Sequence, residues 1–227
     1  MSVPPLPRDD AGRLAWVREH LYVPVVCDVL DDMDRRDRAM HHRLRPLDPD
    51  DCVIVGRART LRWMEVDYVP DGDPYGLEID LMDSLKPGDV AVHSSDHAFT
   101  NAPWGELMST LAKRNGAVGC VCDSMVRDCR RIMAMKFPVF TAGIRPLDSK
   151  GRGKVMAFDV PIRCGGVLVR PGELVFADYD GVVVVPRDVE DDALALAAEK
   201  VGKENGTRRE LLKGRTLRSV YDEFGVL

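Results

Sequence analysis

The 227-residue chain has no long apolar run, no signal segment and no excess of basic charge. No apolar stretch approaches the roughly 18 residues that span a membrane. The start, MSVPPLPRDD, lacks a basic and then apolar segment, so we expect a cytoplasmic protein. Lys and Arg number 32 against 37 Asp and Glu, a formal charge of −5. This balance argues against nucleic acid as a partner, but allows a local site for a small anion.

The chain also lacks a CxxC pair. We expect reduced thiols at all six cysteines, which are Cys27, Cys52, Cys120, Cys122, Cys129 and Cys164. A zinc site at Cys120 and Cys122 is the alternative, because alternation along a strand puts both on one face. No second Cys/His pair with suitable spacing supports it.

Hydrophobic periodicity predicts helices over 9–21 and 24–33 and a strand over 52–63. Residues 65–80, rich in Asp, Gly and Pro, predict a loop or a broken helix. The turn 86–89 leads into a strand over 90–93. With 45% hydrophobic residues, the chain is long enough to bury a proper core.

The middle and C-terminal parts alternate between helix and strand patterns. We expect helices over 104–115, 124–135, 189–203 and 208–224, the last opened by a capping box at Thr207 and Glu210. Strands are expected over 117–123, 137–141, 154–162, 166–170, 173–179 and 181–186.

Strict β-α-β alternation fails after residue 150, so neither an eight-unit barrel nor a doubly wound sheet is expected. The order of elements predicts an α/β layered domain with a mixed central sheet. We expect one domain over 1–227, with N-terminal helices at about 9–36, a core at about 50–186 and C-terminal helices at about 188–225.

Two predicted helices have N-termini that are candidate anion-binding positions, one near Gly105 and one near Ser124. A helix N-terminus presents free N–H groups and partial positive charge, which favours a carboxylate or phosphate. Gly105 has no side chain to obstruct such a ligand. Asp123, at the end of a strand, is expected to cap the second helix.

Arg127 and Asp128 follow at the same strand-to-helix connection. A guanidinium offers a planar fork of donors to an oxyanion, and a carboxylate is a hard ligand for a divalent cation such as Mg²⁺. An Arg-Asp pair alone is weak support, because most such pairs are surface charges.

The order of motifs adds specificity. Gly105-Glu106-Leu107 is followed by Gly116-Ala117-Val118-Gly119, by Asp123, by Arg127-Asp128 and by FPVF. With KPGDV before them and CGGVLVRPGELVFADYDGVVVVP after them, they resemble the RraA-like family over about residues 20–205. This family includes class II 4-hydroxy-4-methyl-2-oxoglutarate/4-carboxy-4-hydroxy-2-oxoadipate aldolases and the regulator of ribonuclease activity A. Ser124 stands where the family usually has glycine.

The resemblance implies a layered β/β/α fold and a role for each matching residue. The turn formed by Gly105, Glu106, Leu107 and Met108 would hold the pyruvyl carboxylate through its backbone. Arg127 would contact the keto or enolate oxygen. Asp128 would be the one side chain on Mg²⁺ or Mn²⁺, with waters completing the shell.

The function implied is cleavage of a 4-hydroxy-2-oxo acid to pyruvate, with oxaloacetate decarboxylation as a side activity and without a Schiff-base lysine. The resemblance also implies a homotrimer or a dimer of trimers, in which a C-terminal acid of a neighbouring subunit, Glu199 or Glu204, is a candidate to enter the site. The alternative is a non-catalytic regulator of the RraA type that binds a protein such as a ribonuclease.

Other polar residues have plainer interpretations. The segment from His93 to His97 is a candidate for a metal cluster or for substrate specificity, although ordinary loop residues are favoured. Ser109 and Thr110 have no adjacent histidine base, which argues against serine-type catalysis. Exposed or ion-paired positions are expected for His41, His42, Asp28, Asp31, Asp32, Arg57 and Arg59.

Overall fold

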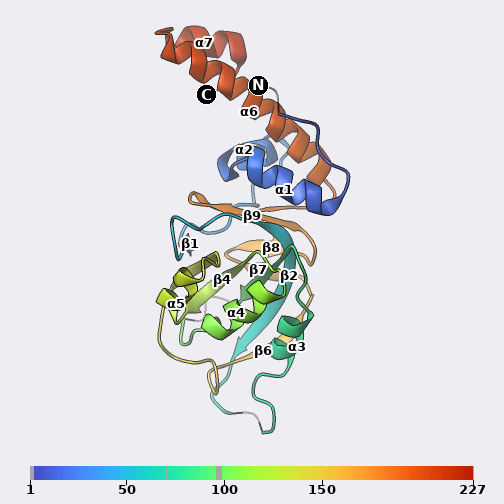
Figure 1. Ribbon diagram of the computed structural model, residues 1–227, viewed down its shortest axis with the longest axis vertical. Coiled ribbons are helices and arrows are strands. Elements are labelled where there is room, and N and C mark those ends of the chain that lie inside the picture. The colour runs from blue at the N-terminus through green and yellow to red at the C-terminus, as the bar shows by residue number, and fades with distance from the viewer. Residues whose placement is uncertain (1–2, 70, 96–98, 227) are drawn as a thin grey trace.

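A mixed sheet forms the centre of the computed structural model, which describes residues 3–69, 71–95 and 99–226 (Figure 1). Its strand order is β1-β5-β4-β3-β2-β9-β10, and β6 pairs with β2. The strands are β1 (Arg45–Pro46), β2 (Ile54–Glu65), β3 (Asp89–Ser94), β4 (Gly119–Val126), β5 (Val139–Ile144), β6 (Gly153–Phe158), β9 (Leu174–Asp178) and β10 (Gly181–Val185). A separate hairpin joins β7 (Ile162–Cys164) to β8 (Val167–Val169).

The four inner strands β2, β3, β4 and β5 are parallel, and the remaining pairings are antiparallel. The parallel strands are covered on both faces, which explains their continuous apolar runs. Val92 on β3, for example, lies opposite Val121 on β4, and both are fully buried. The predicted α/β class with a mixed sheet is confirmed.

Helices gather in two groups. The helices are α1 (Asp10–His20), α2 (Val23–Asp32), α3 (Leu77–Ser84), α4 (Glu106–Arg114), α5 (Cys129–Ala134), α6 (Glu190–Leu212) and α7 (Leu217–Phe224). In Figure 1, α1, α2 and the start of α6 lie together beyond β9, whereas α3, α4 and α5 lie against the other part of the sheet. The far end of α6 and α7 project away from the body (Figure 1).

Three apolar clusters hold these layers together. Trp16, Val26 and Leu194 belong to the cluster beneath α1, α2 and α6. A second cluster joins the β7–β8 hairpin to the sheet, and the third lies beneath α3, α4 and α5. Cys120 and Cys122 both belong to the third cluster, so their alternation along β4 is as predicted.

Two predicted helices differ from the structure. Residues 124–126 continue strand β4, and α5 begins only at Cys129. The reason is that Gly143 and Ile144 on β5 pair with Met125 and Val126, and Thr141 Oγ1 donates to Ser124 O. At the C-terminus α6 runs unbroken through Thr207, which is buried inside it, so the predicted capping box is wrong. Thr216 caps α7 instead, accepting a hydrogen bond from Ser219 N at 3.3 Å.

Helix α3 lies partly within the segment predicted as a loop or broken helix, since it begins at Leu77.

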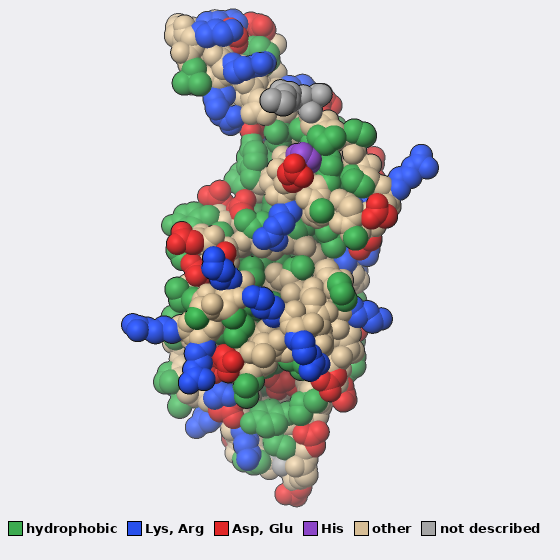
Figure 2. All heavy atoms as spheres, in the orientation of Figure 1, with side chains coloured by type: hydrophobic (Ala, Val, Ile, Leu, Met, Phe, Trp, Pro, Cys, Tyr) green, Lys and Arg blue, Asp and Glu red, His purple; other side chains and the backbone are tan. Residues whose placement is uncertain are grey.

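Positive and negative side chains are interspersed over the face drawn in Figure 2. In the ranges that the structure describes, no helix combines the length and apolarity needed to cross a membrane.

Candidate active site

The segment that leads into α4 meets the end of β4, an inner strand of the sheet. Trp104 forms a parallel bridge with Val126, and Arg127 N donates to Trp104 O at 3.0 Å. The Trp104 ring is fully buried, and its Nε1 donates to Ser109 Oγ at 2.8 Å. The end of β4 and the start of α4 are therefore held side by side, and Ser109 has a structural role here.

Gly105 allows this approach to be close. A Cβ atom at this position would lie 2.9 Å from Asp128 Oδ2 and 3.2 Å from Arg127 Cγ. Both distances are shorter than ordinary van der Waals contacts, so a side chain would displace the carboxylate. The glycine thus leaves the face of Asp128 open toward the helix N-terminus.

Helix α4 directs its free amides at the same place. Its first intrahelical bond is donated by Ser109 N to Gly105 O at 3.1 Å, which leaves the N–H groups of Glu106, Leu107 and Met108 at the positive end of a nine-residue helix. Glu106 N donates to Asp128 Oδ2 at 3.3 Å. An anion beside Asp128 would meet these amides.

Asp128 and Arg127 are both accessible. Asp128 has the left-handed backbone (φ 58°), which aspartate tolerates better than most residues, and 44% of its side chain is exposed. Arg127 Nε lies 4.0 Å from Asp128 Oδ2, and its Nη2 lies 3.1 Å from Asp148 Oδ1. Asp148 thus holds the Arg127 guanidinium beside the Asp128 carboxylate, which stays accessible.

All six predicted site residues border one cavity of about 740 Å³. Its lining comprises Tyr75, Glu78, Ile79, Met82, Ala102, Pro103, Trp104, Gly105, Glu106, Leu107, Met108, Leu111, Arg127, Asp128, Arg131, Asp148 and Ser149. Polar groups and apolar side chains, such as Met82 of α3 and Leu111 of α4, line it together, a composition typical of a pocket for a small ligand.

Five polar residues of this cavity escaped the sequence analysis, which are Tyr75, Glu78, Arg131, Asp148 and Ser149. Tyr75 hydroxyl donates to Asp148 Oδ2 at 3.0 Å. Glu78 is 7% exposed, and burial, reinforced by the negative charge of Asp148, raises its pKa to about 8 against the lowering influence of Arg127. Glu78 precedes Leu81 and Met82 by three and four residues, a spacing that puts all three on one face of a helix. This spacing is the signal by which the sequence could have placed Glu78 on a buried helix face.

Asp128 fits a hard divalent cation. Within the described ranges no cluster of three His, Cys, Asp or Glu side chains could hold a metal. Mg²⁺, however, is commonly held by one or two carboxylates and several waters. The exposed oxygens of Asp128 and the open space at Gly105 suit that mode, whereas a zinc cage at Cys120 and Cys122 is not formed. All six cysteines are free thiols.

Asp123 does not cap a helix. Its carboxylate accepts from Ser95 N at 2.8 Å and from Gly165 N at 3.3 Å, and it is 2% exposed. It therefore ties the loop after β3 to the β7–β8 hairpin. Ser124, predicted to open a helix, lies within β4 and donates to Asn101 O at 3.4 Å.

His93 is a core residue. It is fully buried on β3, its Nδ1 accepts from Trp63 Nε1 at 3.1 Å, and burial lowers its pKa to about 3. A metal cluster that includes His93 is thus not formed by the described side chains, and Asp96 and His97 lie outside the described residues. As expected, exposed positions are occupied by His41, His42, Asp28, Asp31 and Asp32.

The C-terminal glutamates lie far from the cavity of their own chain. Glu199 pairs with Lys203 at 2.8 Å, and Glu204 accepts a hydrogen bond from the hydroxyl of Tyr22. Both belong to α6, which Figure 1 shows beyond β9, whereas α4 lies against the other part of the sheet. Their entry into the site of a neighbouring subunit stays a prediction.

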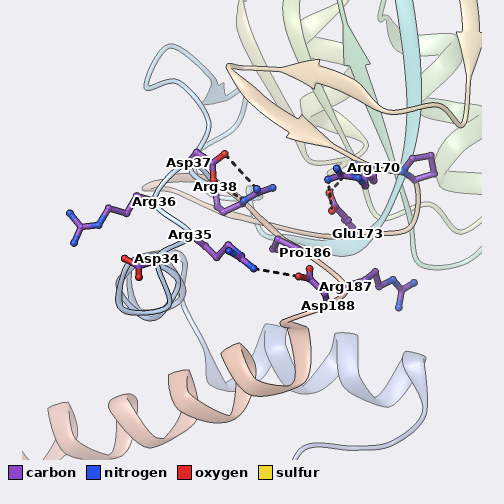
Figure 3. Close-up of a pocket in the computed structure, with 11 residues that line it drawn as sticks. Asp34, Arg35, Arg36, Asp37, Arg38, Arg170, Glu173, Pro186, Arg187 and Asp188 are labelled. Carbon is purple, nitrogen blue, oxygen red and sulfur yellow. Dashed lines mark hydrogen bonds and ion pairs between the residues drawn. The ribbon is translucent and has the colours of Figure 1, made fainter.

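A second cavity, of about 890 Å³, lies between the end of α2 and the segments around Arg170 and Arg187 (Figure 3). Five arginines and four acids line it, and several of them pair with one another. Arg35 lies 3.5 Å from Asp188, and Arg170 lies 3.8 Å from Glu173. The charges largely offset each other, so this cavity has no strong preference for an anion.

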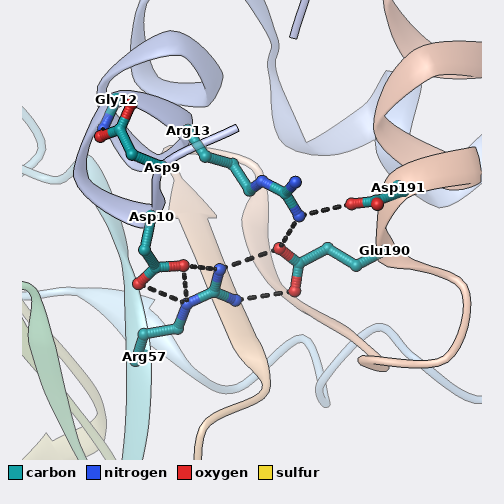
Figure 4. Close-up of polar contacts among 7 residues, drawn as sticks. All are labelled: Asp9, Asp10, Gly12, Arg13, Arg57, Glu190 and Asp191. Carbon is teal, nitrogen blue, oxygen red and sulfur yellow. Dashed lines mark hydrogen bonds and ion pairs between the residues drawn. The ribbon is translucent and has the colours of Figure 1, made fainter. Parts of the chain in front are cut away.

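Arg57 and Arg59 were expected to be either exposed or ion-paired, and both are ion-paired. Arg57 binds Asp10 and Glu190, and Arg13 binds Glu190 and Asp191 (Figure 4). Arg59 pairs with Asp89 and Asp159, at 3.0 and 2.9 Å. These groups join elements of the scaffold and lie outside the lining of the 740 Å³ cavity.

The protein is thus a layered α/β domain with a mixed sheet and a candidate ligand site at the N-terminus of α4. Comparison with known families identifies its class: the RraA-like model, described as Aldolase/RraA, matches residues 23–184. The chain belongs to the RraA-like family.

Similar proteins cover nearly the whole chain. A Halalkalibacterium halodurans protein named "Putative 4-hydroxy-4-methyl-2-oxoglutarate aldolase" is 34% identical over 202 residues, covering 88% of this chain and 90% of that protein. An uncharacterized Methanocaldococcus jannaschii protein is 36% identical over 214 residues, covering 93% and 95%.

Solved structures share the fold. An uncharacterized protein from Pseudomonas syringae has a TM-score of 0.84 at 25% identity, covering 98% of this chain and 99% of that one. RraAS2 of Streptomyces coelicolor, described as an unusual member of the RNase ES inhibitor RraA family, has a TM-score of 0.74 at 27% identity, covering 93% and 100%.

Proposed function

We propose that this protein is a divalent-metal-dependent class II aldolase that cleaves a 4-hydroxy-2-oxo acid to pyruvate and a second carbonyl compound, and that also decarboxylates oxaloacetate. One observation carries the proposal: Gly105, Arg127 and Asp128 converge on a single cavity at the N-terminus of α4. Family membership and the aldolase name of a relative that matches most of the chain support it.

Each group of residues in the cavity would have its own role in binding or catalysis. The amides of Glu106, Leu107 and Met108 would bind the carboxylate of the 2-oxo acid, because a helix N-terminus favours an anion. Arg127, held by Asp148, would donate to the oxygen that becomes negative as the C–C bond breaks. The charge that develops on this oxygen is the largest change in the reaction, so a fixed guanidinium there lowers the barrier.

Asp128 would hold Mg²⁺ or Mn²⁺, which when bound polarises the keto group and neutralises negative charge. No lysine lines the cavity among the described residues. An aldolase that works through a Schiff base needs a lysine amine at the reacting carbon. The lining therefore supports the metal-dependent class.

The test combines oxaloacetate or a 4-hydroxy-2-oxo acid with Mg²⁺ and follows pyruvate. We expect release that EDTA abolishes and that Asp128→Asn reduces by at least about 100-fold, with Mg²⁺ binding lost in calorimetry. Asp34→Asn is the matched control, because Asp34 is also exposed and left-handed (φ 57°) but lies outside this cavity. Pyruvate release by the Asp128 variant at the wild-type rate would defeat the proposal.

A non-catalytic regulator of the RraA type is the second candidate, favoured by the match to RraAS2 along 93% of this chain. A chain that neither binds Mg²⁺ nor releases pyruvate, yet inhibits a ribonuclease, would favour it.

Either function is compatible with a homotrimer or a dimer of trimers, which we propose on the basis of the family. The projecting arm of α6 and α7, with Leu212 84% exposed, offers surface for such contacts, and ultracentrifugation tests the assembly.

A further inference from the structure

Glu78 is the least expected side chain in the cavity. It lies in the first turn of α3, is 7% exposed and borders the cavity between Tyr75 and Met82. No hydrogen bond or ion pair to another described residue engages its carboxyl group. Buried carboxyl groups are almost always paired. An unpaired one that lines a ligand cavity therefore points to a partner that is the ligand itself.

The other acids of the cavity are engaged. Asp148 accepts from Tyr75 and pairs with Arg127, and Asp128 accepts from the amide of Glu106. The Glu106 carboxylate accepts from Thr110 Oγ1 at 3.0 Å. Among the acids that line the cavity, Glu78 is thus the one whose carboxyl group is not committed to a described neighbour.

The surroundings of Glu78 keep it protonated near neutral pH. Burial is the main reason that its pKa is raised, and the Asp148 charge adds to it while Arg127 opposes it. Elsewhere around it, Tyr75 is neutral and hydrogen-bonded to Asp148, and α4 contributes Met108 and Leu111 to the lining. The buried thiol of Cys122, on β4, has a raised pKa and is also neutral.

We propose that Glu78 is a further catalytic residue, the acid that delivers a proton to C3 of the pyruvate enolate. The proposal rests on the proposed aldolase function and deepens it. The O–H bond of the Glu78 carboxyl breaks as a C3–H bond forms from the electron pair of the enolate C=C bond, and the C2=O double bond is restored. The carboxylate then regains a proton from water, so the group returns to its starting state.

Proton exchange isolates this step. Pyruvate incubated with the protein and Mg²⁺ in D₂O should exchange its methyl protons, because the same group removes and returns a proton at C3. We expect Glu78→Gln, which keeps the volume of the side chain, to slow exchange by at least about 100-fold, as for loss of a general acid. CO₂ release from oxaloacetate in a single turnover should fall less than about 10-fold, since C–C cleavage precedes protonation.

The pH profile is a second readout. Wild-type exchange should rise with pH through an inflection above the usual range of a glutamate, because the carboxylate form removes the methyl proton. Glu78→Gln should lack the inflection. Asp80→Asn is the matched control on the same helix, where Asp80 is exposed and outside the cavity. Should the Gln variant fail to fold, Glu78→Asp, which keeps an acid at shorter reach, should still exchange slowly and keep the inflection.

Unchanged exchange in Glu78→Gln would overturn the proposal, and so would an equal loss of exchange and of single-turnover CO₂ release, which indicates a structural role. Failure of the aldolase function has a different signature: the wild type itself would neither release pyruvate nor exchange its methyl protons, and this inference would fall with it.

Discussion

Arg57 and Glu190 face each other through two parallel hydrogen bonds, from Nη1 to Oε2 at 2.7 Å and from Nη2 to Oε1 at 2.9 Å (Figure 4). The residues are 133 positions apart, and both are buried. Burial alone would raise the pKa of Glu190, but hydrogen bonds from Arg57 and Arg13 outweigh it and hold the pKa below the usual value. The pair ties the start of α6 to strand β2.

Arg57→Met should destabilise the protein by about 3 kcal/mol, because it leaves the buried Glu190 with one arginine instead of two. Urea unfolding at neutral pH measures the loss. Arg59→Met is the matched control, because Asp159, one of its partners, is partly exposed, and a cost near 1 kcal/mol is expected. Equal costs for the two variants would show that burial does not strengthen the Arg57 pairs.

Glu78→Gln should become more stable relative to the wild type as pH rises. The folded pKa of Glu78, about 8, lies above its unfolded value of 4.5, so the wild type is stabilised below pH 4.5 and loses that stability as pH rises toward 8. Each unit of pKa difference is worth about 1.4 kcal/mol. Denaturant unfolding between pH 5 and about 9 measures the difference, and a pH-independent difference would contradict the raised pKa.

Gly105→Ala should fold but lose activity. The new Cβ would lie 2.9 Å from Asp128 Oδ2, so the carboxylate must move away from the amide of Glu106. We expect a fall of about 100-fold in pyruvate release, as when a reacting group is misplaced by about 1 Å. Turnover and Mg²⁺ affinity provide the measurement. Gly202→Ala, with open space around it on α6, is the control, and full activity in the Gly105 variant would refute the need for close approach.

Asp148→Asn should loosen Arg127 without unfolding the protein. The ion pair at 3.1 Å is lost, although an amide of the same shape can still accept from Tyr75. Because Arg127 is proposed to stabilise charge in the transition state, kcat should fall by about 10-fold or more while KM changes little. Steady-state kinetics with oxaloacetate provide the readout. An unchanged kcat would mean that the guanidinium needs no such support.

The tertiary structure decided several local outcomes that periodicity could not. Residues 124–126 have a pattern compatible with helix, but pairing with β5 extends β4 through them. The capping box at Thr207 failed because the helix before it does not end, and Gly206 leaves room for Phe224 of α7 to pack against α6. Asp123 caps no helix; instead, its carboxylate accepts hydrogen bonds from Ser95 and Gly165, which lie in two other loops.

By itself, the sequence determined the alternation of strands and helices, the mixed sheet and the motif residues from Gly105 to Asp128, because these depend on local patterns of apolar side chains, glycines and charges. Only the tertiary structure placed Glu78, Tyr75 and Asp148 at the same cavity. The physical reason is that burial and charge pairing depend on segments distant along the chain. The carboxyl group of Glu78 acquires its raised pKa from desolvation and from Asp148, 70 residues further on.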